Sequence, residues 1–148
     1  MADVYGQGYG EELLSKAFKK YRHDVIIGIK FGYDLHDMQS LLNLDRPLQR
    51  FDKDFVRSAC EGSLRRLKTD YIDLYQIHDP PNDVAYISEL FMLLDDLVAE
   101  GKIRHYGAAI TQDVDFEMGV LGLLNRINVA ALQVPFNIFD YEQELDIE

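Results

Sequence analysis

Four short apolar segments alternate with amphipathic segments along this chain, and this alternation restricts the fold more than any other feature. The apolar segments are VIIGIK (25–30), YIDLYQIH (71–78), RHYGAAI (104–110) and VAALQVPF (129–136). Short apolar runs of this kind suit strands that are buried on both faces, as in a parallel sheet. Helices that alternate with such strands favour parallel pairing with right-handed crossovers. The sequence therefore predicts an α/β fold with four parallel strands and four helices.

Apolar residues at helical spacing predict the four helices, over residues 10–20, 53–68, 84–100 and 114–125. The last of these is weakened by two glycines. The apolar residues expected on the first helix are Leu13, Leu14, Ala17, Phe18 and Tyr21. Those expected to point inward from the third helix are Ile87, Leu90, Phe91, Leu94, Leu97 and Val98. Asp73 lies in a buried strand, and we expect it to form structural hydrogen bonds.

The composition excludes several classes of protein. The formal net charge is −11, which argues against general nucleic-acid binding, because that needs a basic surface. No apolar run reaches the roughly 18 residues of a membrane span, and the first residues lack the basic and apolar regions of a secretory signal. Cys60 is the single cysteine, so no intrachain disulfide can form, which fits a reducing cytoplasm. Cys60 lies on an apolar helix face, where we expect a buried and unreactive thiol.

Two further motifs are interpreted as structural. The segment GQGYG (6–10) superficially suggests a phosphate-binding loop, but no strand precedes it, as a dinucleotide-binding fingerprint requires. His36 and His105 have no other metal-ligating residues at a useful spacing. The sequence therefore predicts neither a phosphate-binding loop nor a metal site.

A longer motif points to a particular family. The segment CEGSLRRLKTDYIDLYQIHDP (60–80) closely resembles the aldo-keto reductase family, in which a Glu-x-Ser-Leu-x-Arg-Leu helix leads into an Asp-Tyr-Ile-Asp-Leu-Tyr-x-x-His strand. Four more segments are similar to the family in the same order. They are ADVYGQGYGEELLSKAF (2–18), VIIGIKFG (25–32), GKIRHYGAA (101–109) and ALQVPFNIFD (131–140). The resemblance covers nearly the whole chain.

The resemblance implies a TIM-type (β/α)8 barrel, which needs about 250 residues when complete. The four strands expected here correspond to the third to sixth strands of that barrel. The chain is therefore predicted to form a partial barrel, about half of the whole, as a single domain over residues 1–148.

The resemblance also implies a set of catalytic residues. The family uses a Tyr, a Lys, a His and an Asp, and Tyr5, Lys30 and His78 match three of these positions. Tyr5 would protonate the nascent alkoxide, Lys30 would stabilise the phenolate, and His78 would orient the substrate carbonyl. The family's Asp lies five residues before the Tyr, immediately before Met1, and Asp3 does not match it.

The cofactor implied by the resemblance is NADPH, and few of its contacts are expected here. Gln133 matches one residue that holds the nicotinamide amide. Where the family usually has Ser-Asn after the third of these strands, this chain has Ala109 and Ile110, whose side chains cannot form hydrogen bonds. The remaining contacts of the family lie in the last two βα units, to which no segment of this sequence corresponds.

Three functions therefore stay open. The first is NADPH-dependent reduction of a small carbonyl substrate, lost or residual in the isolated chain. The second is a non-catalytic oligomeric half-barrel, and the third is a subunit completed by a second chain. Four strands cannot close a barrel, so we expect exposed sheet edges and an exposed inner face. The residues expected on that face come from Ile27, Ile29, Leu74, Gln76, Leu132 and Val134. A homo-oligomer, with a dimer favoured, would bury these surfaces; no nucleic-acid or membrane partner is expected.

Overall fold

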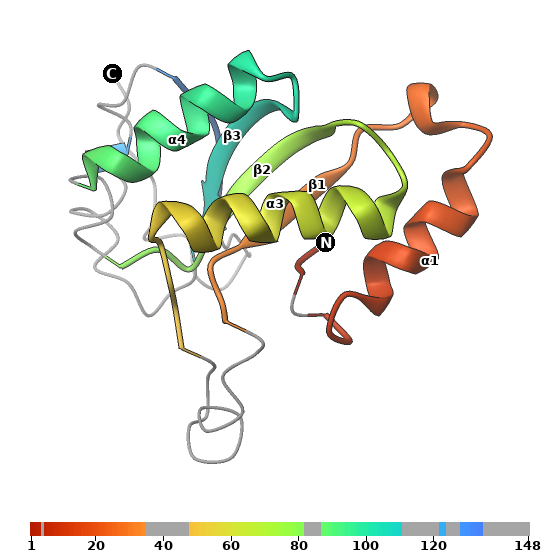
Figure 1. The fold of residues 1–148 in the computed structure, drawn as a ribbon, viewed down its shortest axis with the longest axis horizontal. Helices are drawn as coiled ribbons and strands as arrows, with labels where there is room; N and C mark the ends of the chain where they lie inside the picture. The colour runs from red at the N-terminus through yellow and green to blue at the C-terminus, as the bar shows by residue number, and fades with distance from the viewer. Residues whose placement is uncertain (4, 35–47, 82–86, 111–121, 124–127, 135–148) are drawn as a thin grey trace, which may run out of the picture.

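Four parallel strands in the order β1-β2-β3-β4 form the centre of the computed structural model (Figure 1). The strands are β1 (Gly28–Phe31), β2 (Ile72–His78), β3 (Ile103–Ala109) and β4 (Val129–Gln133). The helices are α1 (Tyr9–Phe18), the short 3₁₀ helix η1 (Arg22–Asp24), α3 (Lys53–Leu67) and α4 (Ser88–Ala99). The structure describes residues 1–3, 5–34, 48–81, 87–110, 122–123 and 128–134. The predicted α/β fold is confirmed, whereas the helix expected over 114–125 lies almost wholly outside the described residues.

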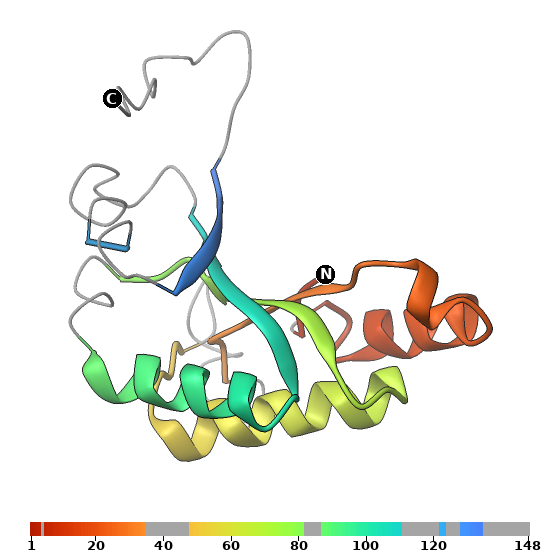
Figure 2. The ribbon, with the colours of Figure 1, turned by 90° about the horizontal axis from the view of Figure 1, so that it is seen from above.

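The helices α3 and α4 cover one face of the sheet, and no described helix covers the opposite face (Figure 2). The helix α1 lies beyond the β1 side of the sheet and packs against α3. Next to β1, the backbone of the first residues begins another parallel pairing. Ala2 forms a bridge with Lys30, whose backbone N–H donates to the Met1 carbonyl at 2.8 Å. The sheet is therefore open at β1, apart from this short pairing.

The strand register separates the two faces of the sheet. Because side chains alternate along a strand, the neighbours Ile29 and Tyr75, and likewise Phe31 and Ile77, point to the same face. These four side chains are buried in one core with residues of α3 and α4. The Phe31 and Tyr75 rings stack there with centroids 4.1 Å apart. The residues between them, including Lys30 and its neighbour Gln76, consequently face the other, inner side.

The inner face differs from the apolar surface that we expected. Leu74 lies on it, as predicted, but Ile27 and Ile29 are buried in the core on the helix side. Leu132 pairs with the buried Ala108 and packs against the same core. The inner-face neighbours of β3 and β4 are Gly107 and Ala131. The strand alternation therefore leaves small and polar residues, rather than large apolar ones, on most of this face.

The helix faces are partly as predicted. In α4 the buried residues include Leu90, Leu94 and Leu97, but Val98 is 38% exposed, while Leu93, which we did not expect inside, is buried. For the first predicted helix, the inward face is wrong at Leu13 and Ala17 of α1 and at Tyr21 beyond its end, which are all exposed. The one fully buried residue of α1 is Glu11, which forms an ion pair with Arg66 of α3. Among the described elements, α1 makes its main contact with the helix α3, so the face that its apolar spacing defines is only partly covered.

Local hydrogen bonds explain where the elements begin. The Asp52 carboxylate caps α3 by accepting from the Phe55 backbone N–H at 3.0 Å. The Asp73 carboxylate accepts from the Ile27 backbone N–H at 3.0 Å and lies 2.9 Å from the Arg22 guanidinium. The structural role expected for Asp73 is confirmed. These contacts tie the residues before β1 to β2.

Candidate functional site

Three of the predicted site residues lie at the carboxyl ends of their strands, on the inner face. Lys30 is the second-to-last residue of β1, and His78 is the last residue of β2. His78 is the neighbour of Ala109 on β3, and Ala109 is the neighbour of Gln133 on β4. A side chain at each of these positions faces the same space. The carboxyl ends of the strands are where active sites lie in barrels of this type.

Tyr5 reaches this space from a turn that precedes α1. Its backbone N–H donates to the Ala2 carbonyl at 3.1 Å, and its ring lies edge-on to the His78 ring with centroids 6.4 Å apart. The next three residues, Gly6 to Gly8, all have positive φ, which turns the chain sharply into α1. At Gly8 the φ of +90° would strain any residue with a side chain, and an added Cβ atom would lie 2.6 Å from the Arg66 side chain. The Tyr5 side chain is 49% exposed and accessible to a ligand.

The groups around His78 have opposing effects on its pKa. Its side chain is largely buried, and this burial lowers the pKa of His78. The Lys30 ammonium lowers the same pKa further, whereas the Asp79 carboxylate raises it. Because burial is the largest of these effects, the imidazole is neutral at neutral pH. A neutral imidazole can donate one hydrogen bond to a carbonyl oxygen without a net charge.

Three residues beside His78 were not predicted as site residues from the sequence. The Tyr33 ring lies edge-on to the His78 ring at 5.0 Å, and the Tyr33 hydroxyl donates to Asp79 Oδ2 at 3.1 Å. Gln49 Nε2 donates to the carbonyls of His78 and Asp79, at 2.9 and 2.7 Å. Tyr33 lies two residues after β1, and Asp79 directly follows β2. This position at the carboxyl ends of strands is the signal that could have identified them.

The described residues fit only part of a nicotinamide site. Gln133 presents an exposed amide at the end of β4. Ala109 and Ile110 are buried, and their side chains carry no polar atom. Their backbones are occupied, since the Ala109 carbonyl accepts from Asp79 N–H and the Ile110 N–H donates to the Gln133 carbonyl, both at 2.8 Å. One amide side chain does not hold a dinucleotide, so these residues do not by themselves form a complete cofactor site.

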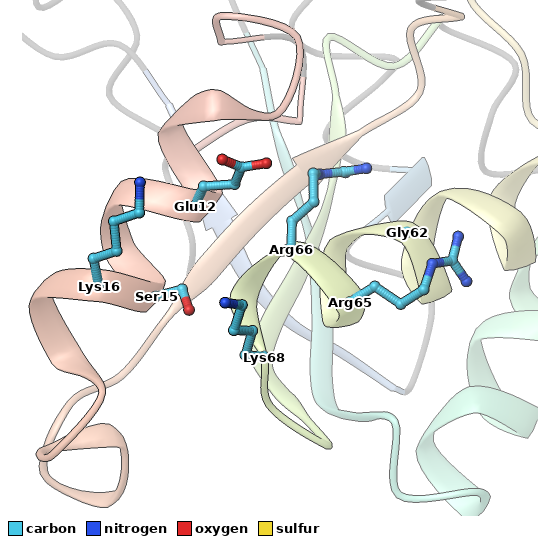
Figure 3. A pocket seen from close by; sticks show the side chains of 7 residues that line it. All are labelled: Glu12, Ser15, Lys16, Gly62, Arg65, Arg66 and Lys68. Carbon is cyan, nitrogen blue, oxygen red and sulfur yellow. The ribbon is translucent and has the colours of Figure 1, made fainter.

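A separate groove lies between α1 and α3, on the helix side of the molecule (Figure 3). It has a volume of about 310 Å³. Its lining residues are Glu12, Ser15, Lys16, Gly62, Arg65, Arg66 and Lys68. The three cations from α3 and its cap lie at the carboxyl end of that helix, where positive charge complements the helix dipole. Their position at the helix terminus is therefore favourable without a bound ligand.

The part of the chain that the structure describes contains no group of three or more His, Cys, Asp or Glu residues that could hold a metal ion. Within the same residues, no helix has the length and apolar character needed to cross a membrane.

The fold and the inner-face residues define part of an α/β-barrel protein with polar side chains at the carboxyl ends of its strands. The model of the aldo/keto reductase family matches residues 1–147, and the chain belongs to this family. Over 144 residues it is 33% identical to the uncharacterized oxidoreductase YqkF of Bacillus subtilis, covering 97% of this chain and 44% of YqkF.

Solved structures give the same result. The holo form of the aldo-keto reductase AKR11C1 from Bacillus halodurans has a TM-score of 0.77 at 32% identity, covering 91% of this chain and 42% of that protein. An aldo/keto reductase from Klebsiella pneumoniae in complex with NADP and acetate has a TM-score of 0.71 at 30% identity, covering 99% and 45%. The chain therefore spans less than half the length of these relatives. Its strands form about half of a (β/α)8 barrel, as predicted.

Proposed function

We propose that this chain carries the proton-donating and carbonyl-binding part of a reductase site for a small carbonyl substrate. The observation that supports this is the convergence of Lys30, His78 and Gln133 on one inner face, with the Tyr5 ring 6.4 Å from the His78 ring. Tyr5 donates the proton to the carbonyl oxygen as it becomes an alkoxide. His78 holds that oxygen by a hydrogen bond, and the Lys30 ammonium stabilises the negative charge that the phenol acquires.

The cofactor of the reaction is NADP(H), which is proposed from the relatives, one of which is a complex with NADP. When bound, it supplies the hydride that reduces the carbonyl carbon. In this chain Gln133 would contact the nicotinamide amide, and the other contacts would come from the remaining βα units of a complete barrel. We therefore propose that reduction is lost or residual in the isolated 148 residues and is recovered in a complete barrel.

A chimera tests this function. These 148 residues replace the matching segment of YqkF, whose other segments complete the barrel. The chimera is expected to reduce an aromatic aldehyde with NADPH, measured by absorbance at 340 nm. Tyr5→Phe is expected to lower kcat at least about 100-fold, the usual contribution of general acid catalysis, with NADPH affinity unchanged. Tyr9→Phe is the matched control, since Tyr9 is a second exposed tyrosine before a glycine.

A folded chimera that binds NADPH and whose rate is the same with Tyr5 and with Phe would refute the role of Tyr5. The isolated chain is tested by calorimetric titration with NADPH. Micromolar affinity there would contradict the proposal that the cofactor needs contacts from outside these residues.

A second candidate function, assembly with another copy or another chain, is favoured by the open side of the sheet at β1. A groove of about 470 Å³ lies there. Its lining residues are Met1, Leu14, Phe18, Val25, Ile26, Ile27 and Gly28. The Ile26 side chain is 85% exposed, and apolar exposure next to a sheet edge favours pairing with another strand. We propose a homo-oligomer, with a dimer favoured, that covers this groove.

Light scattering at micromolar concentration tests the assembly. The wild-type chain is expected to be a dimer that dissociates when Ile26→Lys is introduced. A well-folded wild-type monomer would contradict the proposed homo-oligomer.

A further inference from the structure

The contacts around His78 show a carboxylate that is held close to the imidazole but outside hydrogen-bond distance. Asp79 Oδ2 lies 3.8 Å from His78 Nε2. The same oxygen accepts the Tyr33 hydroxyl at 3.1 Å. Good hydrogen bonds between these atom types are about 2.7–3.2 Å long. The tyrosine hydroxyl, and not the imidazole, is therefore the group bonded to this oxygen.

The backbone of Asp79 is also held in place. Asp79 has a φ of +47°, a conformation that an L-residue adopts at a cost. Its N–H donates to the Ala109 carbonyl, and its own carbonyl accepts from Gln49. His78 Nδ1 and Asp79 Oδ1 are both buried and have no hydrogen-bond partner among the described residues.

We propose that Tyr33 and Asp79 are positioning residues, in which the Tyr33 hydroxyl restrains the Asp79 carboxylate and so keeps His78 a neutral imidazole with a fixed ring. The Tyr33 ring contributes the edge-on contact that holds the ring plane. The functional meaning rests on the reductase function proposed above, in which a neutral His78 donates a hydrogen bond to the substrate carbonyl. Released from Tyr33, the carboxylate would approach Nε2 and form a charge-assisted bond that favours the imidazolium.

Among the described residues, the titratable side chains of Tyr5 and Tyr33 contact the His78 ring, and three charged groups act on it. They are Asp79 in the same segment, Lys30 on β1 and the amino group of Met1. Asp79 favours the protonated form, and the two cations oppose it. Changes at Tyr33 and at Asp79 should therefore shift the His78 titration in opposite directions, which a general loss of packing would not do.

The test is an NMR titration of the imidazole signals of the 148-residue chain, with His78 assigned from the spectrum of His78→Gln. Tyr33→Phe keeps the ring and removes only the hydroxyl. It is expected to raise the pKa of His78 by about one unit, as a newly approaching carboxylate does. Asp79→Asn is expected to lower this pKa, and the double variant is expected to match Asp79→Asn. Glu89→Gln, which removes one charge from the exposed surface of α4, is the control and should leave it unchanged.

A fall or no change in Tyr33→Phe would overturn the proposal, and so would a rise in Asp79→Asn. If Tyr33→Phe does not fold, the sign of the shift in Asp79→Asn decides the matter. The titration needs neither cofactor nor turnover, so its failure is distinct from a failure of the Tyr5→Phe test of the reductase function.

Discussion

Replacing Arg66 by methionine should strongly destabilise the chain, because it leaves a buried carboxylate without its cation. Glu11 is fully buried in α1, and Glu11 Oε2 accepts a hydrogen bond from Arg66 Nε. Its other oxygen, Oε1, is buried with no hydrogen-bond partner among the described residues. Arg66→Met keeps most of the aliphatic stem and removes the guanidinium. The buried carboxylate would then lose its ion pair with Arg66.

Breaking a buried ion pair by removing one partner costs about 3–5 kcal/mol. The Arg66 side chain is 32% exposed, so part of its charge is already solvated, and we expect a loss near the lower limit, about 3 kcal/mol. The double variant Glu11→Leu with Arg66→Met removes both charges and should recover most of that loss. Arg65→Met, on the exposed neighbouring position, is the matched control and should change stability by about 0.5 kcal/mol or less.

The assay is urea unfolding followed by circular dichroism at 222 nm, which gives the free energy of unfolding for each variant. The difference between the double variant and the sum of the single variants is the coupling energy of the pair. A loss below about 1 kcal/mol in Arg66→Met, or a double variant as unstable as Arg66→Met, would refute this reasoning. Either result would mean that water reaches Glu11 and that the pair behaves as a surface ion pair.

Three other predictions follow from the described contacts. Burial raises the pKa of Cys60 to about 12, so a disulfide reagent at pH 8 should react far more slowly with the folded chain than in urea; equal rates would contradict this. Hydrogen bonds from Arg57 and Lys102 lower the pKa of Glu100 from 4.5 to about 2. Its stabilising contribution is therefore complete above about pH 4.5 and lost as the pH falls to 2, so Glu100→Gln should flatten the plot of Tm against pH there; an unchanged slope would argue against it. In Gly107→Val, the added Cβ would lie 2.1 Å from a carbonyl oxygen of β4, so a loss of about 1–3 kcal/mol with shifted β4 amide signals is expected; a variant with wild-type stability and spectrum would show that the two strands separate easily.

Much of the fold could be predicted because most elements pack against the sheet. α3 lies over it, and its predicted range of 53–68 matches the observed Lys53–Leu67 closely. In α1 the same periodicity gave a wrong prediction of the buried face, since this helix packs mainly on α3 and its one fully buried residue is Glu11. Helical spacing predicts which residues share a face, but it does not say what that face packs against. An ion pair between Glu11 and Arg66 joins residues 55 positions apart, and no local pattern predicts it.

The candidate site also contains residues that the sequence predicted and residues that only the structure brought together. Motif resemblance predicted Tyr5, Lys30 and His78 as site residues, and the strand register places Lys30 and His78 on one face. Tyr33 and Asp79 belong to no motif that we used. The ends of β1 and β2 lie side by side, and this brings the Tyr33 hydroxyl to Asp79 across 46 positions of sequence.

The sequence by itself determined the class of fold, the order of its strands and helices, and the family, because hydrophobic periodicity and motif spacing are properties of neighbouring residues. Only the tertiary structure decided which side chains face the open inner side of the sheet, why a glutamate is buried in α1, and how the His78 imidazole is held. Those outcomes depend on register and on contacts between distant segments. Alternation places Lys30 and His78 on the inner face only after the parallel pairing of β1 with β2 is set.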